Sequence, residues 1–196
     1  MKKILVVLIM VLISIPMVYS QTYKAPEKEA EIKGFKKNNV SIFLSDVVMK
    51  RISLEYEYVV GETGNMSINI PVSYSIDKME NIYGYETTWW AGIGMKLYPT
   101  GQGKIRYFIG PEVRIIAADN NYTDVYYYEG FTEEKTIEEN LIHSAFLLNN
   151  GMIYEPSENF IFSVNLGLGF VNIDSEDSYS SFYPMATPSV RMGIRF

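Results

Sequence analysis

The chain closes with Ala186-Thr-Pro-Ser-Val-Arg-Met-Gly-Ile-Arg-Phe196, and this stretch decides the fold. From Pro188 onward the even positions carry apolar side chains, whereas the odd positions carry polar or small ones. Alternation with a period of two predicts a β-strand with one apolar and one polar face. A terminal aromatic on the apolar face and two arginines on the other are unusual for a soluble domain. They fit a strand whose apolar face meets lipid while its arginines point into a polar lumen.

The first twenty residues have the pattern of a secretory signal peptide. Lys2 and Lys3 precede an apolar run from Ile4 to Ile15, and small residues lead up to Ser20. A basic start, a short apolar run and a small-residue cleavage point define such peptides, so we expect residues 1–20 to be removed after Ser20. The run is too short to span a bilayer comfortably. The chain has no cysteine, which excludes a lipid-anchored lipoprotein, disulfides and thiolate metal sites.

Composition narrows the partners further. Without Lys2 and Lys3 the 17 basic residues fall to 15 against 23 acidic ones, a net charge of −8, which argues against a nucleic-acid partner. Sixteen tyrosines and two tryptophans are typical of proteins that cross a membrane–water interface. No later segment has eighteen uninterrupted apolar residues, which excludes a helical membrane protein. Residues 21–38 are charged, mixed in sign and weakly patterned, and we expect a periplasmic lead-in there.

From Asn39 the two-residue alternation continues almost to the end of the chain. Ile68 and Ile70, for example, face opposite to Ser67 and Asn69. We expect eight strands, each about long enough to cross a membrane when tilted. They are Asn39–Val48, Arg51–Val60, Met66–Ile76, Trp89–Pro99, Ile105–Ala118, Leu141–Glu155, Phe160–Asn172 and Pro188–Phe196.

The connections between these strands sort by length. Three are short turns, at 61–65, 100–104 and 156–159, and three are long loops, at 77–88, 119–140 and 173–185. Short turns at one end and long loops at the other are the pattern of outer-membrane barrels, with the turns in the periplasm. The first connection, near Met49-Lys50, is short where that rule expects a long loop. Pro71 lies inside an expected strand and suggests a bulge.

This pattern resembles the small eight-stranded outer-membrane barrels of the OmpA/OmpX type, in the porin-like superfamily, over residues 39–196. The resemblance implies an all-β, eight-stranded antiparallel up-and-down transmembrane β-barrel in the outer membrane of a Gram-negative bacterium. It also implies insertion by the barrel assembly machinery among lipid and lipopolysaccharide, and we expect a monomer. In that class the closing strand is the assembly signal, here Val190, Met192, Ile194 and Phe196. The alternative, a soluble lipocalin-like barrel, would place apolar side chains inside and charges outside.

Charged residues of the inward parity form the first candidate site. An eight-stranded barrel is only wide enough for side chains to fill, and buried charges need partners. We therefore expect a polar network that plugs the lumen, with a gated proton or ion path as the alternative. Its members are Glu55, Glu57, Lys96, Arg106, Glu112, Arg114, Arg191 and Arg195. Inward glycines at 92, 94, 167 and 169 are expected to give room to these bulky side chains.

An enzyme acting on lipid A is a third possibility to weigh. Deacylases of the PagL type are eight-stranded barrels with a His, a Ser two residues later and a Glu nearby. Here His143 is the only histidine, but the position two residues later is Ala145, and Ser144 points to the opposite face. Glu155 is a loose match for the acid. Without a nucleophile beside the base the mechanism fails, so we expect no enzymatic activity.

The loops carry the second candidate site. Residues 119–140 are rich in acidic side chains, which could bind divalent ions, but no EF-hand spacing is present. Exposed tyrosines beside flexible polar residues suit protein or glycan recognition. The candidate recognition residues are Tyr122, Tyr126, Tyr127, Tyr128 and Phe131. The sequence thus predicts a non-enzymatic barrel, structural or surface-interacting, without cofactor or metal and with an unidentified extracellular partner; a narrow channel for small solutes or ions is the alternative.

Overall fold

The computed structural model describes residues 36–77, 85–101, 103–128, 131–175 and 178–196, with side chains inside strands described except at 120–139 and 174–181. The expected signal peptide and all but the end of the expected lead-in lie outside the described residues. Residues Lys36–Phe196 form one compact unit. Within the described ranges no helix is long and apolar enough to cross a membrane.

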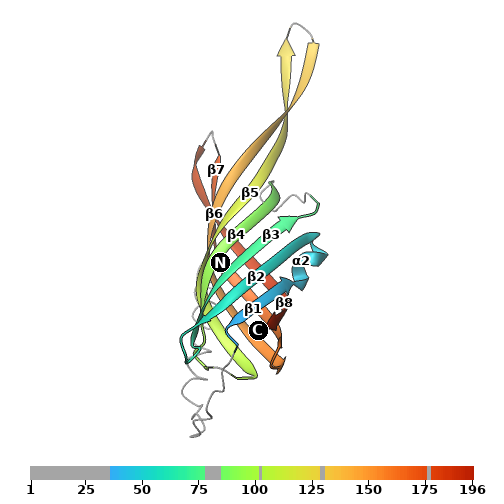
Figure 1. Cartoon of the computed structure of the whole chain (residues 1–196). Coiled ribbons are helices and arrows are strands. Elements are labelled where there is room, and N and C mark those ends of the chain that lie inside the picture. Colours follow the sequence, from blue (N-terminus) through green and yellow to red (C-terminus); the bar gives the residue numbers. More distant parts are fainter. Residues whose placement is uncertain (1–35, 78–84, 102, 129–130, 176–177) are drawn as a thin grey trace, which may run out of the picture. The chain divides into compact units, whose positions relative to one another are not determined.

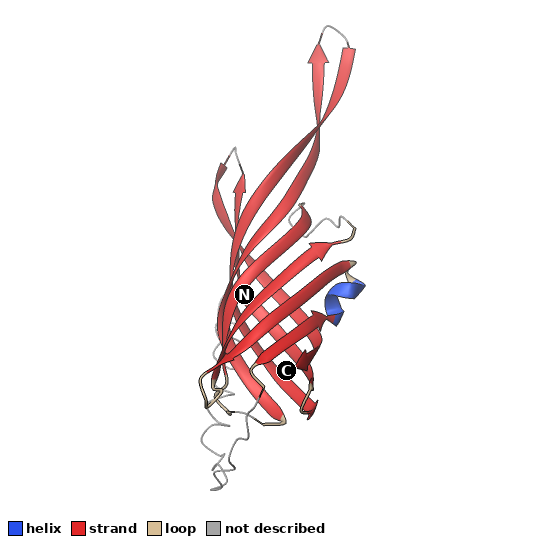
Figure 2. Ribbon diagram, viewed as in Figure 1, coloured by secondary structure: helices blue, strands red, loops and turns tan. Residues whose placement is uncertain are grey.

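The described residues form one closed antiparallel barrel of eight strands (Figures 1 and 2). Each strand pairs with its neighbours in the sequence, and β8 pairs with β1 to complete the closure. This topology confirms the predicted all-β, up-and-down architecture. The elements are β1 (Asn38–Phe43), α2 (Leu44–Val48), β2 (Arg51–Val60), β3 (Met66–Ser75), β4 (Glu86–Leu97), β5 (Ile105–Tyr128), β6 (Phe131–Ser157), β7 (Phe160–Ser175) and β8 (Ser178–Arg195).

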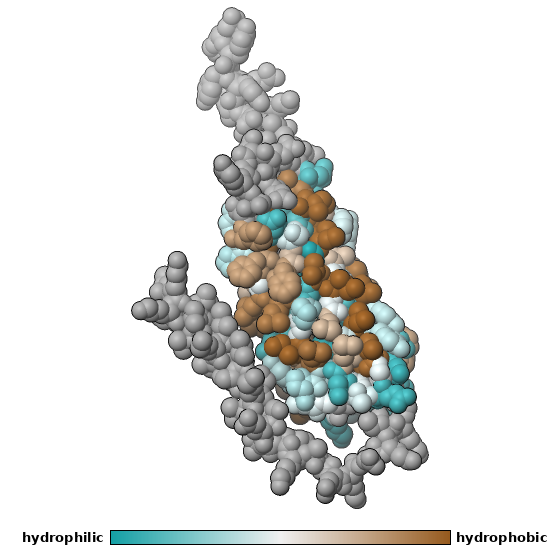
Figure 3. Space-filling view, turned by 90° about the vertical axis from the view of Figure 1, so that its left-hand side faces the viewer, coloured by the Kyte–Doolittle hydropathy of each residue, from teal (hydrophilic) through white to brown (hydrophobic). Residues whose placement is uncertain are grey.

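The barrel is polar inside and apolar outside. In β2, Ser53 and Glu55 are buried, whereas the alternate residues Leu54 and Tyr56 are 43% and 41% exposed. The same alternation runs along β3 and β7. Figure 3 shows apolar side chains covering the middle of the barrel wall on one face, with polar ones below them. A lipocalin-like soluble barrel, which needs the reverse arrangement, is therefore excluded.

The short connections sit at one end of the barrel. Gly61 and Gly101, in the turns after β2 and β4, have φ angles of 77° and 69°, a conformation that glycine adopts without steric cost. Residues that follow β1, β3, β5 and β7 lie at the other end, because the strands are antiparallel. We call these two ends of the lumen the turn end and the loop end.

The first expected strand, Asn39–Val48, is wrong in its second half. β1 stops at Phe43, and residues Leu44–Val48 form the helix α2, which contacts β2 and β8. The strand alternation would have placed Asp46 on the lipid face, whereas the helix buries it. The helix also explains the unusually short first connection, because it takes up residues that we had assigned to the wall.

Two expected loops are also wrong, because the strands run through them. β5 and β6 continue as a two-stranded ribbon in which Asp119 pairs with Asn140 and Tyr128 with Phe131 (Figure 1). β7 and β8 likewise extend through most of the expected loop at 173–185. A two-stranded ribbon has no core to face, so its sequence need not alternate, and the missing alternation led us to expect loops.

Two smaller expectations also need correction. The register between β2 and β3 runs without a shift through Glu55 and Pro71, so Pro71 does not create a bulge. Its ring is buried inside the barrel. β4 begins at Glu86 rather than Trp89, and the register shift in that strand falls between Thr87 and Trp89.

Candidate functional site

The eight inward-facing charged residues expected from the sequence all lie inside the barrel. They come from four strands, β2, β4, β5 and β8, and none is more than 6% exposed. Every one makes an ion pair with a partner inside the lumen, and Lys96 pairs with both Glu55 and Glu57. Such pairing is what the low-dielectric interior demands of a buried charge.

Glu55 lies at the centre of the network and binds side chains from three other strands. One carboxylate oxygen accepts from the Lys96 amine at 2.6 Å, and the other accepts from Arg191 at 2.5 Å and from the Asn69 amide at 3.0 Å. The guanidinium of Arg191 also lies 4.3 Å from the ring centroid of Phe43. Glu55 thus joins β3, β4 and β8 to β2 through three charge-assisted hydrogen bonds.

Glu57 forms the next layer toward the turn end. It accepts hydrogen bonds from Lys96 at 2.9 Å, from Ser67 at 2.6 Å and from the Tyr98 hydroxyl. Beneath it Tyr98 packs against Phe108 in a buried apolar cluster with Ile153 and Ile161. This apolar cluster lies beside the polar network near the turn end, where the Arg106 guanidinium stacks over the Tyr98 ring, 5.1 Å from its centroid.

The sequence did not place Glu155 in the network, and the structure does. Glu155 binds Arg106 and accepts from Arg195 at 2.7 Å, joining β5 and β8 to β6. The position of Glu155 in the sequence could have indicated this, because it is an odd-numbered residue of β6 and, like Ala145, lies on the inward side of the strand. We had considered it only as an enzymatic acid.

A separate pair lies toward the loop end. Arg114 binds Glu112 on the same strand, and Glu112 accepts from the Asn149 amide at 2.8 Å. The Arg114 guanidinium lies 4.0 Å from the ring centroid of Trp90, a cation–π contact. Gly92 stands opposite Arg114, and a Cβ there would lie 3.1 Å from the Arg114 Cγ. The predicted role of the inward glycines, room for bulky lumen side chains, agrees with this contact.

Asp46 is a second buried carboxylate that the sequence did not indicate. It accepts from the Ser53 hydroxyl at 2.5 Å and lies 3.9 Å from Arg51. At the loop end, Lys50 donates to Asp77 at 2.5 Å, and this hydrogen bond and the carboxylate charge raise the pKa of Lys50. Both side chains of that pair are more than half exposed, so it adds little to stability.

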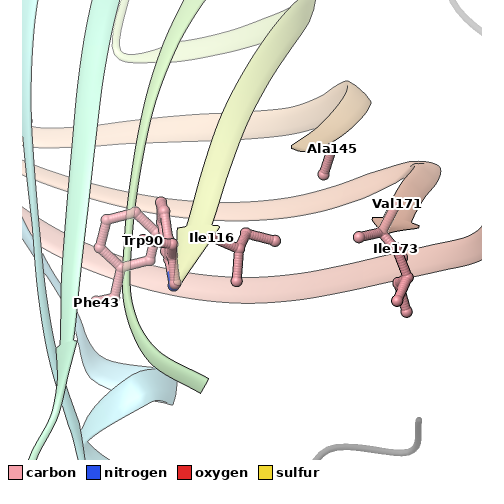
Figure 4. Close-up of a cluster of buried hydrophobic side chains, with 6 residues drawn as sticks. All are labelled: Phe43, Trp90, Ile116, Ala145, Val171 and Ile173. Atoms are coloured by element: carbon pink, nitrogen blue, oxygen red, sulfur yellow. The ribbon is translucent and has the colours of Figure 1, made fainter. Parts of the chain in front are cut away.

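Above the network, the loop end of the lumen holds a cavity of about 400 Å³. Apolar side chains dominate its wall, and Figure 4 shows Phe43 and Trp90 at one side with Val171 and Ile173 at the other. Phe43 and Trp90 pack edge to face, with ring centroids 6.2 Å apart. Arg114, stacked on Trp90, also lines the cavity.

The histidine region does not assemble a hydrolytic site. His143 and Ala145 are both buried in the lumen, 3% exposed, whereas Ser144 faces outward and is exposed. His143 lies beside Tyr85, with ring centroids 5.2 Å apart, so it is a residue of the lumen. Glu155 is bound to two arginines near the turns, and His143 lies at the loop end.

The expected assembly residues of β8 lie on the outer face, where Met192, Ile194 and Phe196 are 38%, 57% and 56% exposed. Val190 is partly exposed. Phe196 also completes the closure, because its backbone exchanges hydrogen bonds of 2.8 and 3.1 Å with Asn38 at the start of β1. Any role of these residues in assembly stays a prediction.

The candidate recognition residues lie in the β5–β6 ribbon. The backbones of Tyr122, Tyr126 and Tyr127 pair with residues of β6, and Tyr128 pairs with Phe131 at the tip. Their side chains, like the acidic ones around them, lie outside what the structure describes. Among the described side chains no group of three or more potential metal ligands comes together.

No protein-family model matches this chain, and no curated protein matches it. A solved structure with a similar fold is the N-terminal β-barrel domain of OprF from Pseudomonas aeruginosa. The match covers 82% of this chain and 99% of that domain, at 12% sequence identity and a TM-score of 0.42. The likeness concerns the fold alone.

Proposed function

We propose that this chain is a non-enzymatic outer-membrane barrel whose lumen is closed by buried ion pairs and whose β5–β6 ribbon meets a partner outside the cell. The apolar outer face supports the membrane location, because exposed side chains such as Ile70, Val113 and Leu148 need lipid around them. The pairing of short turns at one end with long hairpins at the other supports an outer-membrane orientation.

The observation that carries the closed lumen is the layered network around Glu55 and Glu57. Lys96 bridges the two carboxylates, and Arg191 holds Glu55 from the opposite side. An ion crossing this layer would have to displace charges that are already neutralised in a low-dielectric interior. Separating one such pair leaves an uncompensated buried charge, which costs about 3–5 kcal/mol.

The long ribbon supports the surface role. Residues 120–139 pair only across the ribbon itself in the described structure, since β4 pairing ends at Asp119 and β7 pairing begins at Ser144. The ribbon therefore adds nothing to closure of the barrel. A tyrosine-rich, acidic extension of this kind suits recognition of another molecule.

A narrow channel is the second candidate, and the cavity at the loop end favours it. With about 400 Å³ open above Arg114, only the layers from Glu112 to the turns have to open for conduction. Planar-bilayer recording separates the two functions, with Glu62→Gln in the exposed turn as a matched control. We expect no discrete current steps from the wild type. Steps that disappear when Glu112 and Arg114 are neutralised would overturn the closed lumen.

A further inference from the structure

Polar groups gather at one side of the cavity at the loop end. Asp46 of α2, Arg51 at the start of β2 and Ser75 at the end of β3 all line it, and Arg51 pairs with Ser75 in the sheet. Val171 and Ile173 line it from β7, across the barrel from β3 (Figure 4). A mostly apolar wall with a few convergent polar groups is the usual form of a small-molecule site.

The carboxylates of this wall already hold donors. One oxygen of Asp46 accepts from the Ser53 hydroxyl at 2.5 Å, and the other accepts from the Ser45 hydroxyl at 3.3 Å. Asp77, which also lines the cavity, accepts from Lys50 at 2.5 Å. A cationic ligand would have to compete with these hydrogen bonds.

Arg51 is the polar group of the wall whose donors are not satisfied. Its Nε–H is buried and has no hydrogen-bond partner in the part of the chain that the structure describes. One terminal nitrogen lies 3.0 Å from the Met49 sulfur, and a thioether is a weak acceptor. The same nitrogen lies 3.9 Å from an Asp46 oxygen, which is too long for a hydrogen bond. A guanidinium carries five N–H donors, so Arg51 lacks acceptors.

The apolar part of the cavity has room for a ring or a short chain. A cavity of about 150 Å³ holds benzene, and about 400 Å³ is available here. Phe43 and Trp90 pack edge to face in its wall, and the Arg114 guanidinium stacks on the Trp90 ring. The cavity therefore offers apolar contact for the body of a ligand and unused donors for an acceptor group.

We infer that this cavity binds a small monocarboxylate with an apolar body, its carboxylate on Arg51 and its body against Trp90 and Val171. A carboxylate supplies the acceptors that Arg51 lacks, in the bidentate geometry that guanidinium groups favour. A phosphate group would bring more negative charge toward Asp46, which lies 3.9 Å from Arg51. The site lies in the lumen rather than in the β5–β6 ribbon, so it goes beyond the proposed function.

Tryptophan fluorescence tests this inference, because the chain has only two tryptophans and they face opposite ways. Trp90 is 5% exposed and lines the cavity, whereas Trp89 is 41% exposed on the outer face. Trp89→Phe leaves Trp90 as the reporter, and Trp90→Phe leaves Trp89, which responds to a probe that merely enters the lipid. Each variant is inserted into phosphatidylcholine vesicles and titrated with phenylpropanoate or with uncharged phenylpropanol, which has the same body.

We expect a saturable change in Trp90 fluorescence, with phenylpropanoate binding about tenfold more tightly than phenylpropanol, the contribution of one charge-assisted hydrogen bond. Arg51→Met should remove this preference. Lys50→Met is the matched control and should keep it, because Lys50 pairs with Asp77 and is not among the lining residues. Val171→Phe, which fills part of the cavity, should weaken both probes. Gel mobility of unboiled samples checks that each variant is folded.

Four outcomes would overturn the inference. Equal affinity for the two probes rules out recognition of the carboxylate, and a preference that survives Arg51→Met rules out Arg51 as its partner. A preference lost equally in Lys50→Met would reflect the charge of the surface rather than a site. A Trp90 response that does not saturate, or that Trp89 matches, would place the probes in the lipid.

Discussion

Arg191 in β8 donates a hydrogen bond of 2.5 Å to Glu55 in β2, 136 positions earlier in the chain. β1 lies between these two strands, so the pair forms only when β8 has closed the barrel against β1. This contact inside the lumen therefore also links the closing strand to β2. Both side chains are 2% exposed, which makes the pair sensitive to loss of either partner.

Glu55→Gln should destabilise the barrel by about 3–5 kcal/mol, because it leaves Arg191 buried without its carboxylate. Lys96 keeps Glu57 as a partner, so the loss falls mainly on Arg191. Urea unfolding in lipid vesicles measures the change. Glu62→Gln, in an exposed turn, should stay within about 0.5 kcal/mol of wild type; equal effects of the two variants would argue against the network.

Gly94→Ala should destabilise by about 1–3 kcal/mol through overpacking. A Cβ at Gly94 would lie 2.7 Å from the Asn69 side-chain oxygen and 3.1 Å from the Pro111 carbonyl. Asn69 would have to move and weaken its hydrogen bond to Glu55. Gly103→Ala is the matched control, since its nearest neighbour is 3.9 Å away; the same urea titration should leave it unchanged.

Deleting Phe196 should slow insertion of the barrel into vesicles more than any change in the hairpins does. The deletion removes the last hydrogen bonds between β8 and β1 as well as an outward aromatic side chain. Insertion is followed by the mobility of unboiled samples on gels, where a folded barrel runs apart from its boiled form. Wild-type insertion of the truncated chain would contradict the role of Phe196 in closure.

Replacing residues 120–139 with Asn-Gly should leave the stability of the barrel unchanged. Asp119 and Asn140 already pair, and a two-residue Asn-Gly turn joins such a pair without strain. Urea midpoints and gel mobility measure the outcome. A large loss of stability would show that the ribbon supports the barrel, and would remove the argument that it serves recognition.

The sequence revealed the barrel because apolar and polar side chains alternate along most of its wall. From Ile52 to Tyr58 in β2, outward side chains such as Leu54 and Tyr56 alternate with the inward Ser53 and Glu55, so strand and face could be predicted together. Asp46 could have corrected the predicted end of the first strand. A carboxylate on the apolar, outward side of such a strand is energetically unfavourable, which indicates that the strand ends before Asp46.

The ribbon could not be predicted in the same way. A two-stranded ribbon has no core to cover, so its sequence need not show the alternation that identifies a strand of the wall. Glu155 was on the expected face, but its partners Arg106 and Arg195 come from strands that only closure brings together.

Oxygen accessibility of a spin label on the outer wall tests the membrane-barrel assignment most directly. The chain has no cysteine, so Val164→Cys, at an outward position that is 48% exposed, and Glu158→Cys, in the turn before β7, each give a single label. In vesicles we predict that oxygen relaxes the label at 164 and a water-soluble nickel chelate relaxes the label at 158. Relaxation of the label at 164 by the nickel chelate would contradict a wall that faces lipid.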